Sequence, residues 1–117
     1  MRALFHHPDP AWSGEARAFV AAARGLAAQG WQTVLATAAD GEVHRRAAAL
    51  GVAVAALDPD DGVVGATAAL SRVVREHFAE VVFVHGDRGQ MIGAGAAWRA
   101  SRGAVVRRFP AGGAAAV

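Results

Sequence analysis

A short segment in the C-terminal third of the chain carries residue types that handle protons. An apolar run ends at Val84 and is followed at once by His85, Gly86 and Asp87. An imidazole at such a strand exit hydrogen-bonds a ligand hydroxyl or accepts a proton, and a nearby carboxylate orients the ring or binds the ligand. The alternative is that His85 only caps the strand while Asp87 pairs with Arg88 or opens a helix. We take His85 as the candidate catalytic residue, with Gly86 and Asp87 as candidates for substrate binding.

A second candidate segment follows the first apolar run of the chain. It contains His7 and, after two prolines, Ser13, Gly14 and Glu15 at the start of an amphipathic stretch. Glycine lets a backbone approach a substrate, and a helix N-terminus offers free N–H groups to ligand oxygens. Ordinary turn and capping chemistry explains the same residues equally well, because the segment has no G-x-G-x-x-G pattern. We keep these four residues as candidate substrate contacts.

Metal binding and other chemistry have weaker support. His6 and His7 are adjacent, so on a strand they point to opposite faces and cannot share one ion. Three acidic residues at 58, 60 and 61 lack the spacing of a calcium loop and indicate a turn. His44 and His77 fall within helical patterns among charged residues and are expected at the surface. We expect no metal site, and we interpret Gly93, Gly95 and Trp98 as helix-packing positions.

These residues are placed by an alternation of strands and helices. Hydrophobic residues recur at helical spacing in residues 13–29, with Ser13 as the cap and Gly30 as the stop. Further helices are expected at 41–50, 66–78 and, more weakly, 93–102, and strands at 2–6, 31–38, 52–57, 81–84 and 104–106. Short connections and continuously apolar strands predict an α/β fold: a Rossmann-like, doubly wound parallel sheet of about five strands with flanking helices.

Composition supports one globular domain. The chain has 117 residues, of which 54% are hydrophobic and 19% charged, so it can bury a core. All twelve basic residues are scattered arginines, which does not favour nucleic acid. No cysteine is present, the N-terminus lacks a signal-peptide core, and no apolar run is long enough to span a bilayer, so a cytoplasmic location is expected. Residues 111–117 form a low-complexity Ala/Gly tail, at which the fold looks unfinished.

The order of these motifs resembles the N-terminal domain of GT-B glycosyltransferases of family 4. In that family a Gly-Gly loop precedes a helix, which ends in a Leu-Ala-x-x-Gly-His turn, and a later strand reads Asp-Val-Val-His-x-His. The segments that match are Ser13-Gly14, Glu15-Ala16-Arg17, residues 26–31, residues 50–52 and residues 80–85. The chain departs from the pattern at Ser13, Trp31, Phe83 and Arg107-Arg108.

The resemblance implies that residues 1–110 are the acceptor-side domain of a transferase whose C-terminal domain, absent here, binds the nucleotide-sugar donor. It implies that His85 reaches the reacting sugar and that Gly14 approaches the donor phosphates, with no metal or other cofactor required. The acceptor is then a small molecule, lipid or glycan, and peripheral contact with the inner face of the membrane is compatible with this interpretation. We expect the chain alone to be inactive. A stand-alone Rossmann- or flavodoxin-like binding module is the alternative, whereas a response-regulator receiver is set aside because the chain has no lysine.

Overall fold

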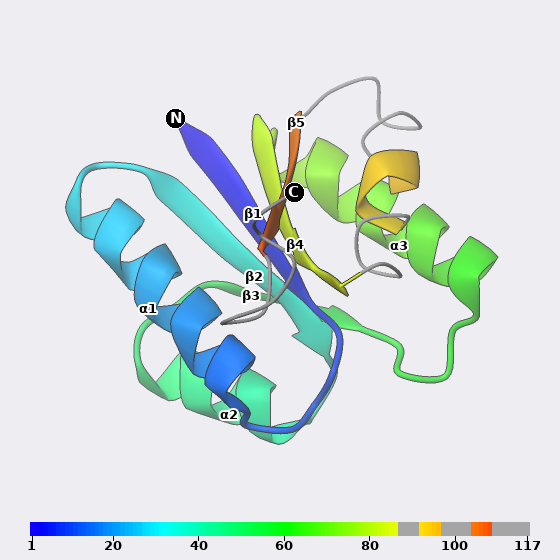
Figure 1. Ribbon diagram of the computed structural model, residues 1–117, viewed down its shortest axis with the longest axis horizontal. Helices are drawn as coiled ribbons and strands as arrows, with labels where there is room; N and C mark the ends of the chain where they lie inside the picture. The colour runs from blue at the N-terminus through cyan, green and yellow to red at the C-terminus, as the bar shows by residue number, and fades with distance from the viewer. Residues whose placement is uncertain (87–91, 97–103, 109–117) are drawn as a thin grey trace, which may run out of the picture.

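The computed structural model describes residues 1–86, 92–96 and 104–108, the last of these by backbone alone. Strands and helices alternate through most of the chain (Figure 1), as the sequence predicts. The elements are β1 (Arg2–His7), α1 (Gly14–Ala28), β2 (Gln32–Ala38), α2 (Glu42–Ala49), β3 (Val54–Leu57), α3 (Val63–Glu76), β4 (Val81–His85) and β5 (Ala104–Arg108). Residues 92–96 are helical, within the weaker helix expected at 93–102.

The sheet is parallel, with strand order β3-β2-β1-β4-β5. The chain therefore builds outward from β1 in one direction and then crosses over to β4 on its other side. In open α/β sheets, ligands bind beside the carboxyl ends of the strands where the order reverses. In this fold that point lies between β1 and β4.

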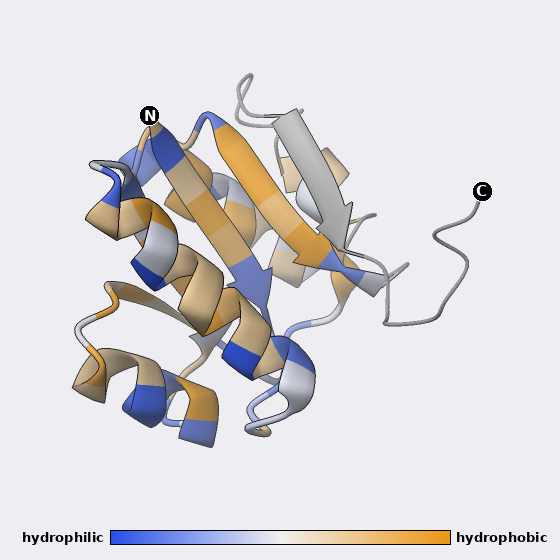
Figure 2. Ribbon diagram, turned by 60° about the vertical axis from the view of Figure 1, so that its left-hand side comes forward, coloured by the Kyte–Doolittle hydropathy of each residue, from blue (hydrophilic) through white to orange (hydrophobic). Residues whose placement is uncertain are grey.

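Helices cover both faces of the sheet, which makes the domain doubly wound. Helices α1 and α2 lie on one side and α3 on the other (Figure 1), and each face has its own hydrophobic core. Along β1 the side chains alternate between the two cores: Phe5 joins the α1 face and Leu4 the α3 face. The strands are apolar in the middle, and the carboxyl ends of β1 and β4 turn hydrophilic (Figure 2).

Helix boundaries follow local capping chemistry. Ser13 caps α1, with its Oγ accepting a hydrogen bond from the Ala16 N–H at 3.2 Å. Gly30 lies just beyond the helix with φ +93°, a left-handed conformation that glycine adopts without strain. Helix α3 begins at Val63, three residues before the predicted start. The prediction relied on the apolar stripe of the helix, and it missed Val63 and Val64 because both are exposed and lie outside that stripe.

Candidate functional site at the β1–β4 edge

His7 and His85 come together at the switch point of the sheet. Phe5 pairs with Phe83 in the β1–β4 register, so the two histidines end neighbouring strands on the same face. Both rings stand edge-on to Phe19 of α1, with ring centroids 5.9 Å and 6.5 Å from it. The β1 and β4 exits that the sequence analysis chose separately are therefore one site, beneath the first turns of α1.

His7 is held as a neutral imidazole by its surroundings. Its side chain is only 5% exposed, and burial lowers its pKa from the ordinary value of 6.5. The Asp9 carbonyl, 3.2 Å from Nδ1, and the Asp9 charge act in the opposite direction, whereas the nearby His85 favours the neutral form further. Because a carbonyl only accepts, the neutral ring donates from Nδ1 to Asp9 and keeps Nε2 as an acceptor, which can bind a hydroxyl proton.

This burial predicts that the domain loses stability as the pH falls. The unfolded chain protonates His7 near pH 6.5, whereas the folded chain resists protonation until a lower pH. Between these values the unfolded state binds more protons, so the free energy of unfolding falls by up to about 1.4 kcal/mol per pH unit from this group. Urea unfolding between pH 7.5 and 5 should show a shallower pH dependence in His7→Gln, whereas the exposed-site variant His77→Gln keeps the parent slope. Equal slopes for His7→Gln and the parent would contradict this assignment.

His85 has unfilled hydrogen-bonding capacity. Its Nδ1 atom is buried and has no hydrogen-bond partner among the described residues, although the side chain as a whole is only half-buried. The next residue, Gly86, has φ +77°, which turns the chain sharply at the strand exit. Asp87 lies outside the described residues. The described geometry thus places His85 and Gly86 at the edge, with a ring nitrogen still to be paired.

The start of α1 lies at the same edge of the sheet (Figure 1). Gly14 is exposed, and a Cβ added to it meets nothing within 4 Å, so its backbone is open to an approaching group. Glu15 is half-buried in the first helical turn. The Ser13 hydroxyl already accepts the capping hydrogen bond, which leaves its proton available as a donor. Both the capping and the substrate-contact interpretations of Ser13 fit this geometry.

The β1–α1 loop is held in place by the start of α2. The Val43 N–H donates to the Pro10 carbonyl at 3.1 Å, and Gly41 lies directly against the Pro10 ring. The Arg46 guanidinium lies 5.5 Å from the centre of the Trp12 ring. Helix α2 therefore sets the position of the loop that links His7 to α1.

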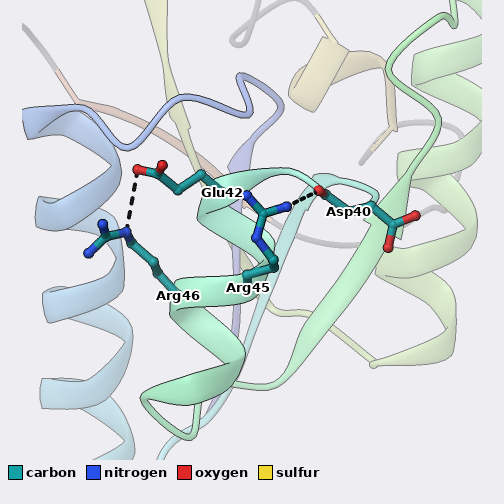
Figure 3. Close-up of polar contacts among 4 residues, drawn as sticks. All are labelled: Asp40, Glu42, Arg45 and Arg46. Atoms are coloured by element: carbon teal, nitrogen blue, oxygen red, sulfur yellow. Dashed lines mark hydrogen bonds and ion pairs between the residues drawn. The ribbon is translucent and has the colours of Figure 1, made fainter.

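Polar contacts in turn fix the start of α2 (Figure 3). Arg46 pairs with Glu42 at 3.3 Å, and Arg45 donates to the Asp40 carbonyl. His44, expected as a solvated surface residue, is half-buried instead, and its Nδ1 accepts a hydrogen bond from the Asp40 N–H at 3.0 Å. That bond supports Asp40 in its left-handed conformation, with φ +59°. His77 is exposed, as expected.

One polar residue on the α1 face of the sheet was not predicted as part of the site. Thr37 of β2 is the register partner of His7, is fully buried, and its Oγ1 has no hydrogen-bond partner within the described part of the chain. Thr37, His7 and His85 thus form a row across three adjacent strands. A threonine in an apolar strand looks like an ordinary strand former, so only the register reveals it.

The other candidates lie elsewhere. His6 faces the α3 side, opposite to His7, as the strand alternation predicts. No group of three or more His, Asp or Glu residues is arranged to hold a metal ion in the described portion of the chain. The acidic residues at 58–61 form a turn, in which the Asp60 N–H donates to Asp58 Oδ1 at 2.9 Å. Gly95 packs on Thr67 of α3, whereas Trp98 lies outside the described residues. Among the helices described, none is long and apolar enough to cross a bilayer.

The architecture is that of the N-terminal Rossmann-like domain of GT-B proteins. No protein-family model and no curated protein sequence matches the chain. The solved structure of MurG from Acinetobacter baumannii superposes with a TM-score of 0.74 at 16% identity, over 92% of this chain and 35% of that one. Anabaena HepE in complex with UDP-glucose gives a TM-score of 0.73 at 15% identity, and HepE with UDP and glucose gives 0.71 at 18%. Each covers 92% of this chain, but only 28% and 29% of HepE.

The neighbours are GT-B glycosyltransferases, and their likeness to this chain is one of fold. The chain spans about a third of the length of MurG and slightly less of HepE. Assignment to family 4 stays a prediction from the sequence motifs.

Proposed function

We propose that this domain is the acceptor-side half of a GT-B glycosyltransferase, similar to family 4, which transfers a sugar from a nucleotide-sugar donor to a small-molecule, lipid or glycan acceptor. The observation that carries the proposal is the meeting of His7 and His85 at the switch point, beside the start of α1. The fold neighbours support it, since HepE was solved with UDP-glucose.

In this proposal His85 is the catalytic residue. Its half-buried imidazole at the strand exit accepts a proton from an attacking hydroxyl or donates a hydrogen bond to the reacting sugar. His7, kept neutral by burial, binds a hydroxyl, and the open backbone at Gly14 receives anionic oxygen at the helix N-terminus. Ser13, Glu15, Gly86 and Asp87 complete the substrate contacts.

The donor is bound mainly by a second domain beyond the 117 residues, so the chain alone transfers no sugar. No metal or other cofactor takes part, and the protein acts in the cytoplasm, with the inner face of the membrane as a place where it meets a lipid acceptor. Nucleic acid is not a partner, because the arginines are scattered.

The test compares sugar transfer by the 117-residue chain with transfer by the longer protein that the proposal requires, in which a donor-binding domain follows, using UDP-glucose and a panel of other nucleotide sugars. We expect product only from the longer protein. Product from the 117 residues alone would contradict the half-enzyme proposal. Nucleotide-sugar binding without transfer or donor hydrolysis by the longer protein would instead support the binding-module alternative.

A further inference from the structure

A cavity lies on the other face of the sheet, outside the row formed by Thr37, His7 and His85. It has a volume of about 270 Å³ and lies at the same carboxyl edge, between the ends of β1, β2 and β3 and the start of α3. Its walls come from five separate segments, including the helical residues 92–96. Nothing in the proposed chemistry of His85 uses this space.

Three of the four polar side chains that line the cavity are carboxylates, which accept hydrogen bonds. Asp9, Asp58 and Asp61 line it, and neither of the two ion pairs formed within the described residues involves them. Backbone N–H groups orient two of these carboxylates: Ala11 donates to Asp9 Oδ1 and Asp60 to Asp58 Oδ1, both at 2.9 Å. A carboxylate has a second oxygen and further lone pairs beyond one such bond. The cavity therefore favours ligands rich in donors and repels anions such as phosphate.

The remaining walls are apolar. The rings of Pro8 and Pro59 stand with the aliphatic ends of β2 and β3 and with Ile92 around the space, and the buried imidazole of His6 adds one polar group. Carboxylates beside flat aliphatic surface match a sugar ring, which has hydroxyls around its edge and C–H groups on its faces. The volume lies just below the usual range for drug-sized ligands, about 300–1,000 Å³, so it suits one ring rather than a nucleotide.

We propose that this cavity binds a single uncharged pyranose ring of the acceptor. The inference rests on the proposed function and deepens it. It assigns the acceptor a neutral sugar at its binding end, held by Asp58 and Asp61 on the α3 face, while His85 works on the α1 face of the same edge.

Titration of the 117-residue chain tests this directly by nuclear magnetic resonance. We expect saturable shifts of the backbone amide signals of Ala38, Leu57 and Ala69 with at least one of three methyl pyranosides (gluco, galacto and manno), at dissociation constants of about 1–10 mM. Ethylammonium chloride and inorganic phosphate should bind more weakly or not at all. Stronger binding of ethylammonium than of every pyranoside would overturn the proposal in favour of a cation site, and absence of saturable shifts with all three pyranosides would overturn it outright.

Matched variants locate the binding. The double variant Asp58→Asn, Asp61→Asn should weaken pyranoside binding about tenfold, because charged acceptors make stronger hydrogen bonds than amides. Asp60→Asn is the control, since Asp60 belongs to the same turn but does not line the cavity. Equal affinity in the double variant and the control would place the pyranoside elsewhere and refute the site. Pyranoside binding by the 117-residue chain requires no transfer of sugar from a nucleotide-sugar donor. Failure of this inference and failure of the proposed function are therefore separate outcomes.

Discussion

In the proposed glycosyltransferase, replacing His85 by alanine is expected to lower the turnover about 100-fold or more while leaving this domain folded. Proton transfer by a positioned side chain contributes about 10²–10⁴-fold to enzymatic rates. The fold tolerates the change because the His85 side chain is only half-buried and its Nδ1 forms no hydrogen bond with the described residues. The measurement is kcat at saturating donor and acceptor, together with the thermal unfolding of each variant.

His77→Ala serves as the matched control for His85→Ala. It removes the same side chain from an exposed position just after α3, at the amino edge of the sheet, and should leave kcat unchanged. If His85→Ala retains kcat within a factor of two, His85 plays no part in the chemistry and its strand-capping role is the correct one. A loss of folded signal in His85→Ala would likewise contradict the expectation stated for it.

The second large effect is expected at Gly41, where alanine destabilises the domain by about 1–3 kcal/mol, the usual cost of overpacking. A Cβ at this position would lie 2.7 Å from the Pro10 Cβ and 3.1 Å from its Cα. A proline ring cannot rotate away, so the β1–α1 loop or α2 must move. Backbone conformation is not the obstacle, because Gly41 has φ −74°.

Gly62→Ala provides the comparison for Gly41→Ala. Both glycines are helix N-caps with nearly the same backbone angles, and a Cβ at Gly62 meets nothing within 4 Å. The two variants share any loss of capping, so the difference between their urea unfolding free energies isolates the clash with Pro10. Equal destabilisation of the two variants would show that Pro10 moves away from the new Cβ without lowering the free energy of unfolding, which would contradict the prediction.

Much of the fold could be predicted from the sequence because the apolar periodicity and the capping residues of a helix are local features. The apolar periodicity of α1, its Ser13 cap and the Gly30 stop all act within a few residues, and the structure confirms each. The strand exits at His7 and His85 are also visible as apolar runs that end in a histidine. Their meeting follows from the doubly wound topology, which is why two separate segments are confirmed as neighbours.

Features that depend on distant segments were not predictable. The contact of Gly41 with Pro10 joins two loops that follow different strands, and the row containing Thr37 depends on the β1–β2 register. The half-buried position of His44 was not predictable either. Its hydrogen bond from the Asp40 N–H depends on the left-handed backbone conformation of Asp40, which the sequence does not indicate. The cavity beside His6 draws on five segments, so no single stretch of sequence signals it.

The consecutive imidazoles of β1 bring their own constraint. His6 faces the α3 side and His7 the α1 side, so a shift of β1 by one position would turn His6 toward the proposed reaction centre and His7 toward the cavity on the α3 side. Hydrogen bonding to β2 on one flank and β4 on the other prevents that slip. Efforts to redirect specificity should therefore leave the length of this strand untouched and vary the turn at 58–62, where changes reach only one of the two sites.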